Sequence, residues 1–142
     1  MKGVVLATKN TIKDMAEVKD IVRAYEQLDT SEPINLPKLL NLKKELSIAV
    51  FNLSLKCGTF GKSFYSTEQE RKVSFHKEKL KAIENGESAA KSESIAESKI
   101  GELRANEALN EATYRGLKEV INSCTHILAT MSKEIDNLNA IK

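Results

Sequence analysis

Histidine and cysteine are the residue types in this 142-residue chain that are best suited to catalysis or metal binding. The two histidines, His76 and His126, have no glutamate or second histidine at the three- or four-residue spacing from which helices build metal sites. The two cysteines, Cys57 and Cys124, form no CxxC pair, and His126 lies about 200° around a helix from Cys124, which is unsuitable for a base. We therefore expect both thiols to be reduced and buried as small hydrophobic groups, and we predict no metal site and no cofactor.

A glycine–lysine–serine triplet, Gly61-Lys62-Ser63, resembles part of a phosphate-binding loop. The preceding glycine, Gly58, stands three residues before Gly61, whereas that loop requires a distance of five. We therefore interpret these glycines as positions that allow a close helix approach or a bend. Without a nucleophile, a base or a phosphate loop, the sequence predicts a protein that is not an enzyme and has no small-molecule substrate.

Basic residues alternate with aromatic residues over positions 60–81. One interpretation is that the aromatic rings stack on bases and the cations bind phosphates, as in proteins that bind single-stranded nucleic acid. The other is that the rings belong to the core and the charges face an acidic helix. The candidate residues for binding a partner protein or nucleic acid are Lys62, Tyr65, Arg71, Lys72, His76 and Lys79.

The elements that must position these residues are helices. Six glycines, two prolines, 5% aromatic residues and no tryptophan are typical of long helices and exclude collagen-like, disulfide-rich and turn-rich β folds. Apolar periodicity and the helix-ending signals at Pro33 and Asn85-Gly86 then place the boundaries. Within a single domain spanning 1–142, we expect a flexible tail at 1–10 and helices at 11–29, 36–84 and 92–141.

The two long helices carry regular apolar seams. From Ala96 to Leu138 the seam positions alternate in steps of four and three, as in a coiled coil. Segment 56–81 contains seven basic and three acidic side chains, and segment 84–111 contains the reverse. The sequence therefore predicts an all-α, antiparallel, coiled-coil-like hairpin that places the two blocks side by side. The helix at 11–29 is expected to pack on its open end, near 39–53 and 121–138.

Glu107 and Asn110 are the polar members of the second seam. The register of the hairpin places Glu107 level with Arg71 and Asn110 level with residues 62–66. A buried carboxylate is costly unless it is paired. Either these residues form a polar layer that fixes the register, or the seam opens here and the surface contacts a partner.

The run RGLKEVINSCTHILATMSKEIDNL (115–138) resembles the closing helix of small helical-hairpin proteins encoded by bacteriophages and prophages. The pairing of ENGESAAKSESIAESK (84–99) with NEALNEATYRGLK (106–118) is similar to theirs as well. The resemblance implies an accessory protein that acts in the host cytoplasm, and it transfers no catalytic residue. We expect binding to a host protein, such as a defence or nuclease system. The alternative is an accessory protein of DNA replication or recombination that binds single-stranded nucleic acid through 60–81.

The chain is expected to be cytoplasmic and to lack membrane contact, because the apolar run at Val4–Ala7 is too short for a signal peptide or a membrane span.

A two-helix arm over 60–110 has little core of its own. The sequence therefore also predicts a homodimer or higher oligomer.

Overall fold

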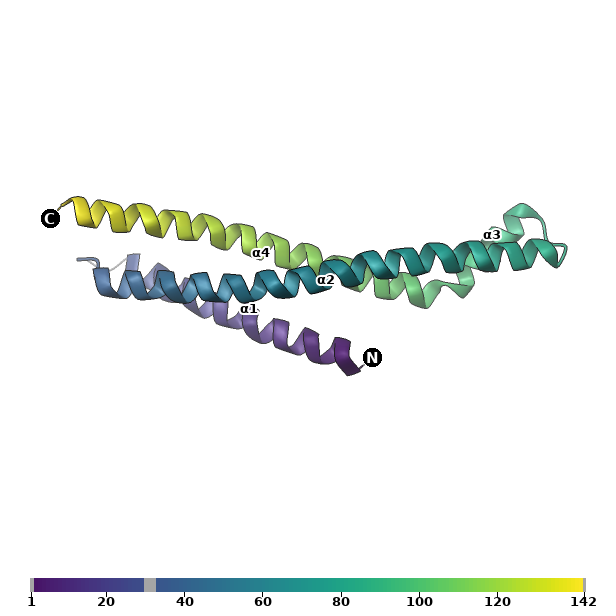
Figure 1. The fold of residues 1–142 in the computed structure, drawn as a ribbon, viewed down its shortest axis with the longest axis horizontal. Helices are drawn as coiled ribbons and strands as arrows, with labels where there is room; N and C mark the ends of the chain where they lie inside the picture. The colour runs from purple at the N-terminus through teal and green to yellow at the C-terminus, as the bar shows by residue number, and fades with distance from the viewer. Residues whose placement is uncertain (1, 30–32, 142) are drawn as a thin grey trace. The chain divides into compact units, whose positions relative to one another are not determined.

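The computed structural model describes residues 2–29 and 33–141, and within them it contains four helices and no strand. The helices are α1 (Lys2–Asp29), α2 (Leu36–Glu84), α3 (Ala89–Lys99) and α4 (Gly101–Ala140), as Figure 1 shows. The predicted all-α class is confirmed. The helices form two compact units. Unit 1 comprises α1, α2 up to Cys57 and α4 from Leu117, and unit 2 comprises residues 58–116.

Unit 1 is a bundle of three helix segments, in which α2 runs antiparallel to α1 and α4 (Figure 1). Its core repeats every seven residues on α2 and α4, because two long helices that stay in contact must bring the same face inward every two turns. The buried residues include Leu39, Leu46 and Leu53 on α2, Leu117, Cys124 and Met131 on α4, and Val18 and Ile21 on α1.

Polar contacts also join α1 to the other two helices of unit 1. The Tyr25 hydroxyl donates to Glu134 Oε1 of α4 at 2.7 Å. Lys56 of α2 forms an ion pair with Asp14, and its ammonium donates to the Asn10 carbonyl at 3.4 Å. The contact at Glu134 lies within the expected range 121–138, whereas Lys56 lies three residues beyond the expected range 39–53.

Unit 2 contains the antiparallel hairpin predicted from the seams. The contacts between its helices move backward along α2 as they move forward along α3 and α4, which defines the antiparallel direction. From the turn outward, the contacting pairs are Glu78 with Lys99, Arg71 with Glu107, and Gly61 with Tyr114.

The turn of the hairpin lies at the Asn85-Gly86 signal. Gly86 has a φ of 87°, a left-handed conformation that glycine adopts without the steric cost of a Cβ atom. Its amide donates to the Ile83 carbonyl at 3.0 Å and so ends α2. Ser88 then begins α3, because its hydroxyl accepts a hydrogen bond from the Lys91 amide at 3.2 Å.

The tail expected at residues 1–10 is wrong from residue 2 onward, because α1 begins at Lys2; Met1 lies outside the described residues. Extending an existing helix costs far less free energy than nucleating one. Residues 2–10 contain no proline that would stop this extension. The predicted beginning at residue 11 is where the apolar stripe starts. The hydrogen-bonded helix itself begins earlier, at Lys2.

The single helix expected over 92–141 is also wrong. Its first part, α3, begins at Ala89, and the helix is interrupted at Ile100, whose φ of −96° and ψ of 11° depart from helical values. Gly101 follows, and a glycine inside a helix costs about 1 kcal/mol relative to alanine. The Ile100 amide still donates to the Ala96 carbonyl at 3.2 Å, so the interruption is confined to a single residue.

Candidate functional site

In unit 1, α2 exposes large apolar side chains on the side that is not part of the core. Phe51 and Leu55 are 62% and 60% exposed, and Ile48 is 54% exposed. Leu40 is 47% exposed. From Leu40 the steps to Ile48, Phe51 and Leu55 are eight, three and four residues, so the four side chains share one side of the helix. We call Leu40, Ile48, Phe51 and Leu55 the apolar row.

The sequence analysis did not identify the apolar row, because it assigned α2 a single apolar seam. The signal is a second set of apolar residues beside that seam, which begins with Leu40 directly after the buried Leu39. Two serines, Ser47 and Ser54, lie along one edge of the row. The hydroxyls of Ser47 and Ser54 donate to the carbonyls four residues earlier on the same helix, at 2.8 and 2.9 Å.

In unit 2, five of the six residues predicted to bind a partner or nucleic acid lie on one side of α2. At 3.6 residues per turn, they fall within about 100° of one another. Lys62, Tyr65, Lys72 and His76 are exposed and Lys79 is half-buried. We call these five residues the basic face. Phe75 positions two of them, since its ring lies 5.6 Å from the ring of His76 and 6.0 Å from the Lys79 ammonium.

Arg71 is the sixth residue, and it lies outside the basic face, on the side of α2 that contacts α4. Its guanidinium is largely buried and forms two hydrogen bonds with the carboxylate of Glu107. The predicted alignment of Glu107 with Arg71 is confirmed, and the assignment of Arg71 to an exposed binding surface is wrong. Asn110 is half-buried one turn of α4 beyond Glu107. Whether these residues fix the register remains a prediction.

An aromatic cluster holds Tyr65 at the edge of the basic face. Its ring centre lies 5.3 Å from that of Phe64 and 6.5 Å from that of Tyr114. Phe64 and Tyr114 are stacked with their centres 6.4 Å apart. Tyr114 can approach so closely because residue 61 is glycine: a Cβ atom at Gly61 would lie 2.7 Å from its ring. Tyr65 is nonetheless 57% exposed.

The acidic helices do not neutralise the basic face as expected. Among the described residues, α2 is joined to the following helices by the Arg71–Glu107 pair and by Glu78 with Lys99, in which α2 supplies the acid. Three glutamates of the acidic block instead form ion pairs with cations nearby in sequence. These local pairs are Glu87 with Lys91, Glu97 with Arg104, and Glu111 with Arg115.

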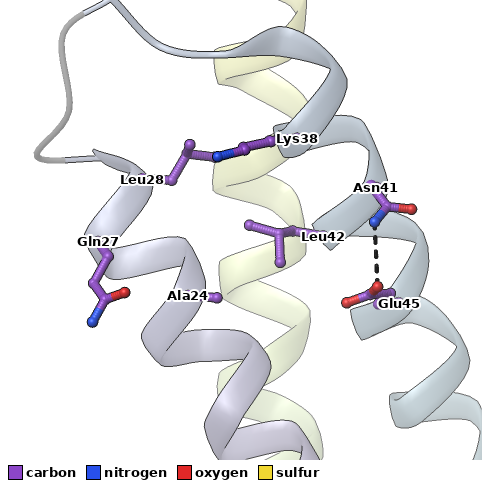
Figure 2. A pocket seen from close by; sticks show the side chains of 7 residues that line it. All are labelled: Ala24, Gln27, Leu28, Lys38, Asn41, Leu42 and Glu45. Carbon is purple, nitrogen blue, oxygen red and sulfur yellow. Dashed lines mark hydrogen bonds between the residues drawn. The ribbon is translucent and has the colours of Figure 1, made fainter.

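A shallow pocket of about 430 Å³ lies between α1 and α2 in unit 1. Figure 2 shows Leu42 and Leu28 pointing into it, with Lys38 reaching across toward Leu28. On the α2 side, the Asn41 amide donates to the Glu45 carboxylate at 3.3 Å. No residue of this pocket was predicted from the sequence, because the pocket is formed by side chains of two helices and no motif marks it.

Both cysteines are buried in unit 1, as expected. Burial raises the pKa of each thiol, and at Cys57 the positive charge of Lys118 offsets part of this effect. A raised pKa lowers the fraction of reactive thiolate. These cysteines therefore fill the core and are poorly suited to act as nucleophiles.

The part of the chain that the structure describes contains no cluster of three or more histidine, cysteine or acidic side chains that could hold a metal ion. In the same residues, no helix is both long enough and apolar enough to cross a membrane. Comparison with known proteins finds no matching family model, no matching curated protein and no matching solved structure.

Proposed function

We propose that this chain is a non-enzymatic accessory protein of the phage type, which binds a host protein in the cytoplasm through a helical surface and blocks or modulates it. The observation that supports this proposal best is the apolar row on α2. The resemblance of 115–138 to phage-encoded hairpins supports the phage-type origin.

The apolar row has the exposed apolar side chains that are typical of a protein-binding surface. Its four side chains together expose on the order of 400 Å² of apolar surface, which is within the range of the functional patches found on single proteins. Burying this surface against a partner is favourable by about 25 cal/mol per Å². Phe51 and Leu55 are one helical turn apart and are the expected anchors, since large apolar side chains dominate most interfaces.

The shape of the row favours a partner with an apolar groove over a second copy of this chain. Two convex copies of the row would bury on the order of 800 Å² in total, whereas stable interfaces bury about 1,200–2,000 Å². A groove also encloses the edge at Ser47 and Ser54, and so buries more surface. Lys44 interrupts the row between Leu40 and Ile48, so we expect an acidic side chain at that end of the groove.

A capture experiment with matched variants tests this proposal. The chain, Phe51→Glu and Asn122→Glu are each immobilised and incubated with host lysate; Asn122 is an exposed residue of α4 in the same unit. We expect a host protein that the chain and Asn122→Glu retain and that Phe51→Glu loses. With that protein purified, Phe51→Glu should weaken binding at least about thirtyfold, as expected for a hot spot.

Two results would contradict the proposal. A captured protein that binds Phe51→Glu as well as it binds the unmodified chain does not use the apolar row. Sedimentation that shows a dimer dissociated by Phe51→Glu would assign the row to a second copy. The homodimer or oligomer predicted from the sequence remains a prediction, and the same sedimentation run tests it.

A further inference from the structure

The lysines of the basic face are available to a ligand in unit 2. Within the described residues, Lys62 and Lys79 have no carboxylate within 4 Å, and Lys72 pairs at 2.9 Å with Glu68 of its own helix. An exposed pair of this kind contributes only about 0.3–0.5 kcal/mol, so a phosphate can displace the glutamate. Among the described residues, none of these three lysines forms an ion pair with a glutamate of α3 or α4, so the neutralisation expected from the acidic block is absent at close range.

Tyr65 adds a flat apolar surface to this charge. Its ring is packed by Phe64 and Tyr114 from within the unit, yet more than half of its surface is exposed. A ring that is already held in place loses little conformational entropy when a planar ligand stacks on it. Every nucleobase has a planar face, so such a ring binds single strands without requiring a particular sequence.

The spacing of the cations suits a chain of phosphates and not a single anion. Lys62 and Lys79 are separated by seventeen residues, which corresponds to about 26 Å along a helix. Lys72 and His76 lie between them on the same side of α2. An elongated, positively charged strip with one exposed ring at its N-terminal end matches a flexible strand that carries regular negative charges and bases.

We propose that the basic face binds single-stranded nucleic acid, with a base stacked on Tyr65 and backbone phosphates contacting Lys62, Lys72 and Lys79. This activity is independent of the apolar row, which belongs to the other unit and requires a different ligand. DNA and RNA share the phosphate and base chemistry that the face recognises. Arg71 takes no part, because its guanidinium is bound to Glu107.

Fluorescence anisotropy tests the proposal. It uses the full chain with labelled 20-nucleotide strands of oligothymidylate DNA and oligouridylate RNA. If three lysines contact phosphates, the logarithm of the affinity should fall with the logarithm of salt concentration with a slope near −2. This slope predicts about a twentyfold loss of affinity between 50 and 200 mM salt. Binding of either strand supports the proposal, and the difference between the strands identifies the preferred nucleic acid.

The variants separate stacking from charge. Tyr65→Ala should weaken binding about tenfold or more, and Tyr65→Phe should retain most of the affinity, because the ring and not the hydroxyl stacks. Lys62→Gln and Lys79→Gln should each reduce the steepness of the salt dependence by about 0.7. Lys133→Gln is the matched control, since it removes an exposed lysine charge from α4 in unit 1, and it should change neither quantity.

The outcomes that would overturn the proposal are distinct. Anisotropy that stays flat up to 100 μM protein at low salt would exclude this ligand class. Equal binding of single and double strands, unaffected by Tyr65→Ala, would show non-specific attraction without stacking. Circular dichroism of each variant must show the helix content of the unmodified chain. A loss of host-protein capture by Phe51→Glu would leave these results unchanged, so the two proposals fail separately.

Discussion

The two units use the same pair of long helices but fill the space between them with different side chains. In unit 1, leucine, isoleucine, valine and methionine are buried at regular positions. In unit 2, the buried residues are mostly small, and a largely buried ion pair lies among them. These buried residues are Phe60, Gly61, Ala82, Ser92, Ala96 and Ile100. Unit 1 is therefore stabilised mainly by apolar burial, and unit 2 depends on close backbone approach and on polar register.

The outward sides of α2 differ in the same way. The part in unit 1 exposes mainly aliphatic and phenyl groups, and the part in unit 2 exposes lysines around one tyrosine. A helix that is apolar on both sides can bury its outer side against a protein partner. A helix with solvated cations attracts an anionic partner instead. One continuous helix thus presents two surfaces that differ in chemistry.

The largest expected effect tests the apolar core of unit 1. Leu46→Ala should lower the free energy of unfolding by about 3 kcal/mol, because it removes a fully buried side chain and leaves a cavity. Leu55→Ala is the control on the same helix, where the side chain is exposed and the loss should stay within about 0.5 kcal/mol. Urea denaturation followed by circular dichroism measures both. Similar losses would show that Leu55 is covered in solution.

The second prediction concerns the ion pair of unit 2. Glu107→Leu and Arg71→Leu should each cost about 2 kcal/mol, because each leaves the other charge largely buried without a partner. The double variant should recover most of this loss, and a double-mutant cycle measures the coupling. Glu68→Leu, which breaks the exposed pair with Lys72, should cost no more than about 0.5 kcal/mol. Additive losses, with no recovery in the double variant, would contradict a polar layer.

The third prediction compares two glycines on α2 in unit 2. Gly61→Ala should lower the stability by about 1 kcal/mol, because the added methyl group must displace the Tyr114 ring. Gly58→Ala meets no atom within 4 Å and should raise the stability by about 0.5–1 kcal/mol, the usual gain from replacing glycine within a helix. Thermal unfolding gives the difference, and near-ultraviolet circular dichroism reports the tyrosine. A stabilising Gly61→Ala would show that the Tyr114 ring does not pack against residue 61.

Patterns that involve many residues were predictable from the sequence. The composition and the apolar repeats predicted the helical class, the repeats with the signals at Pro33 and Asn85-Gly86 predicted the bounds of α2, and the opposite charges of 56–81 and 84–111 predicted the antiparallel direction in unit 2. The register followed from the turn at Asn85-Gly86, and it correctly aligned Arg71 with Glu107. The helical class and the seams are redundant, because each depends on a dozen or more positions that agree, and only the register depends on the two residues of the turn.

Features that depend on a single residue or on rotation about a helix were not predicted. The apolar seam continues through the interruption at Ile100, because that side chain is itself buried. The seam pattern therefore gives no sign of the break. The local pairing of the acidic block was missed because net charge per segment does not say which way a side chain points. A glutamate on a helix has cations within reach three or four residues away, and such a contact orders less of the chain than one between helices.

The smallest expected effect tests that interruption. Arg104 of α4 donates two hydrogen bonds, of 2.7 and 2.6 Å, to Glu97 of α3, and so bridges the residue where the helix breaks. The hydrogen bonds from Arg104 are the main cause that lowers the pKa of Glu97. Arg104→Gln should therefore speed amide exchange at residues 100–104. Arg115→Gln, which removes a pair within α4, should leave those amides unchanged.

The pH dependence of this difference identifies the carboxylate as the cause. A carboxyl group whose pKa is lower in the folded chain than in the unfolded chain stabilises the fold above its unfolded pKa, and the stabilisation is lost as the pH falls through the folded value. The difference between Arg104→Gln and the unmodified chain should be fully present at pH 7 and should shrink below about pH 4. A difference that persists in acid would instead assign the effect to packing of the arginine side chain.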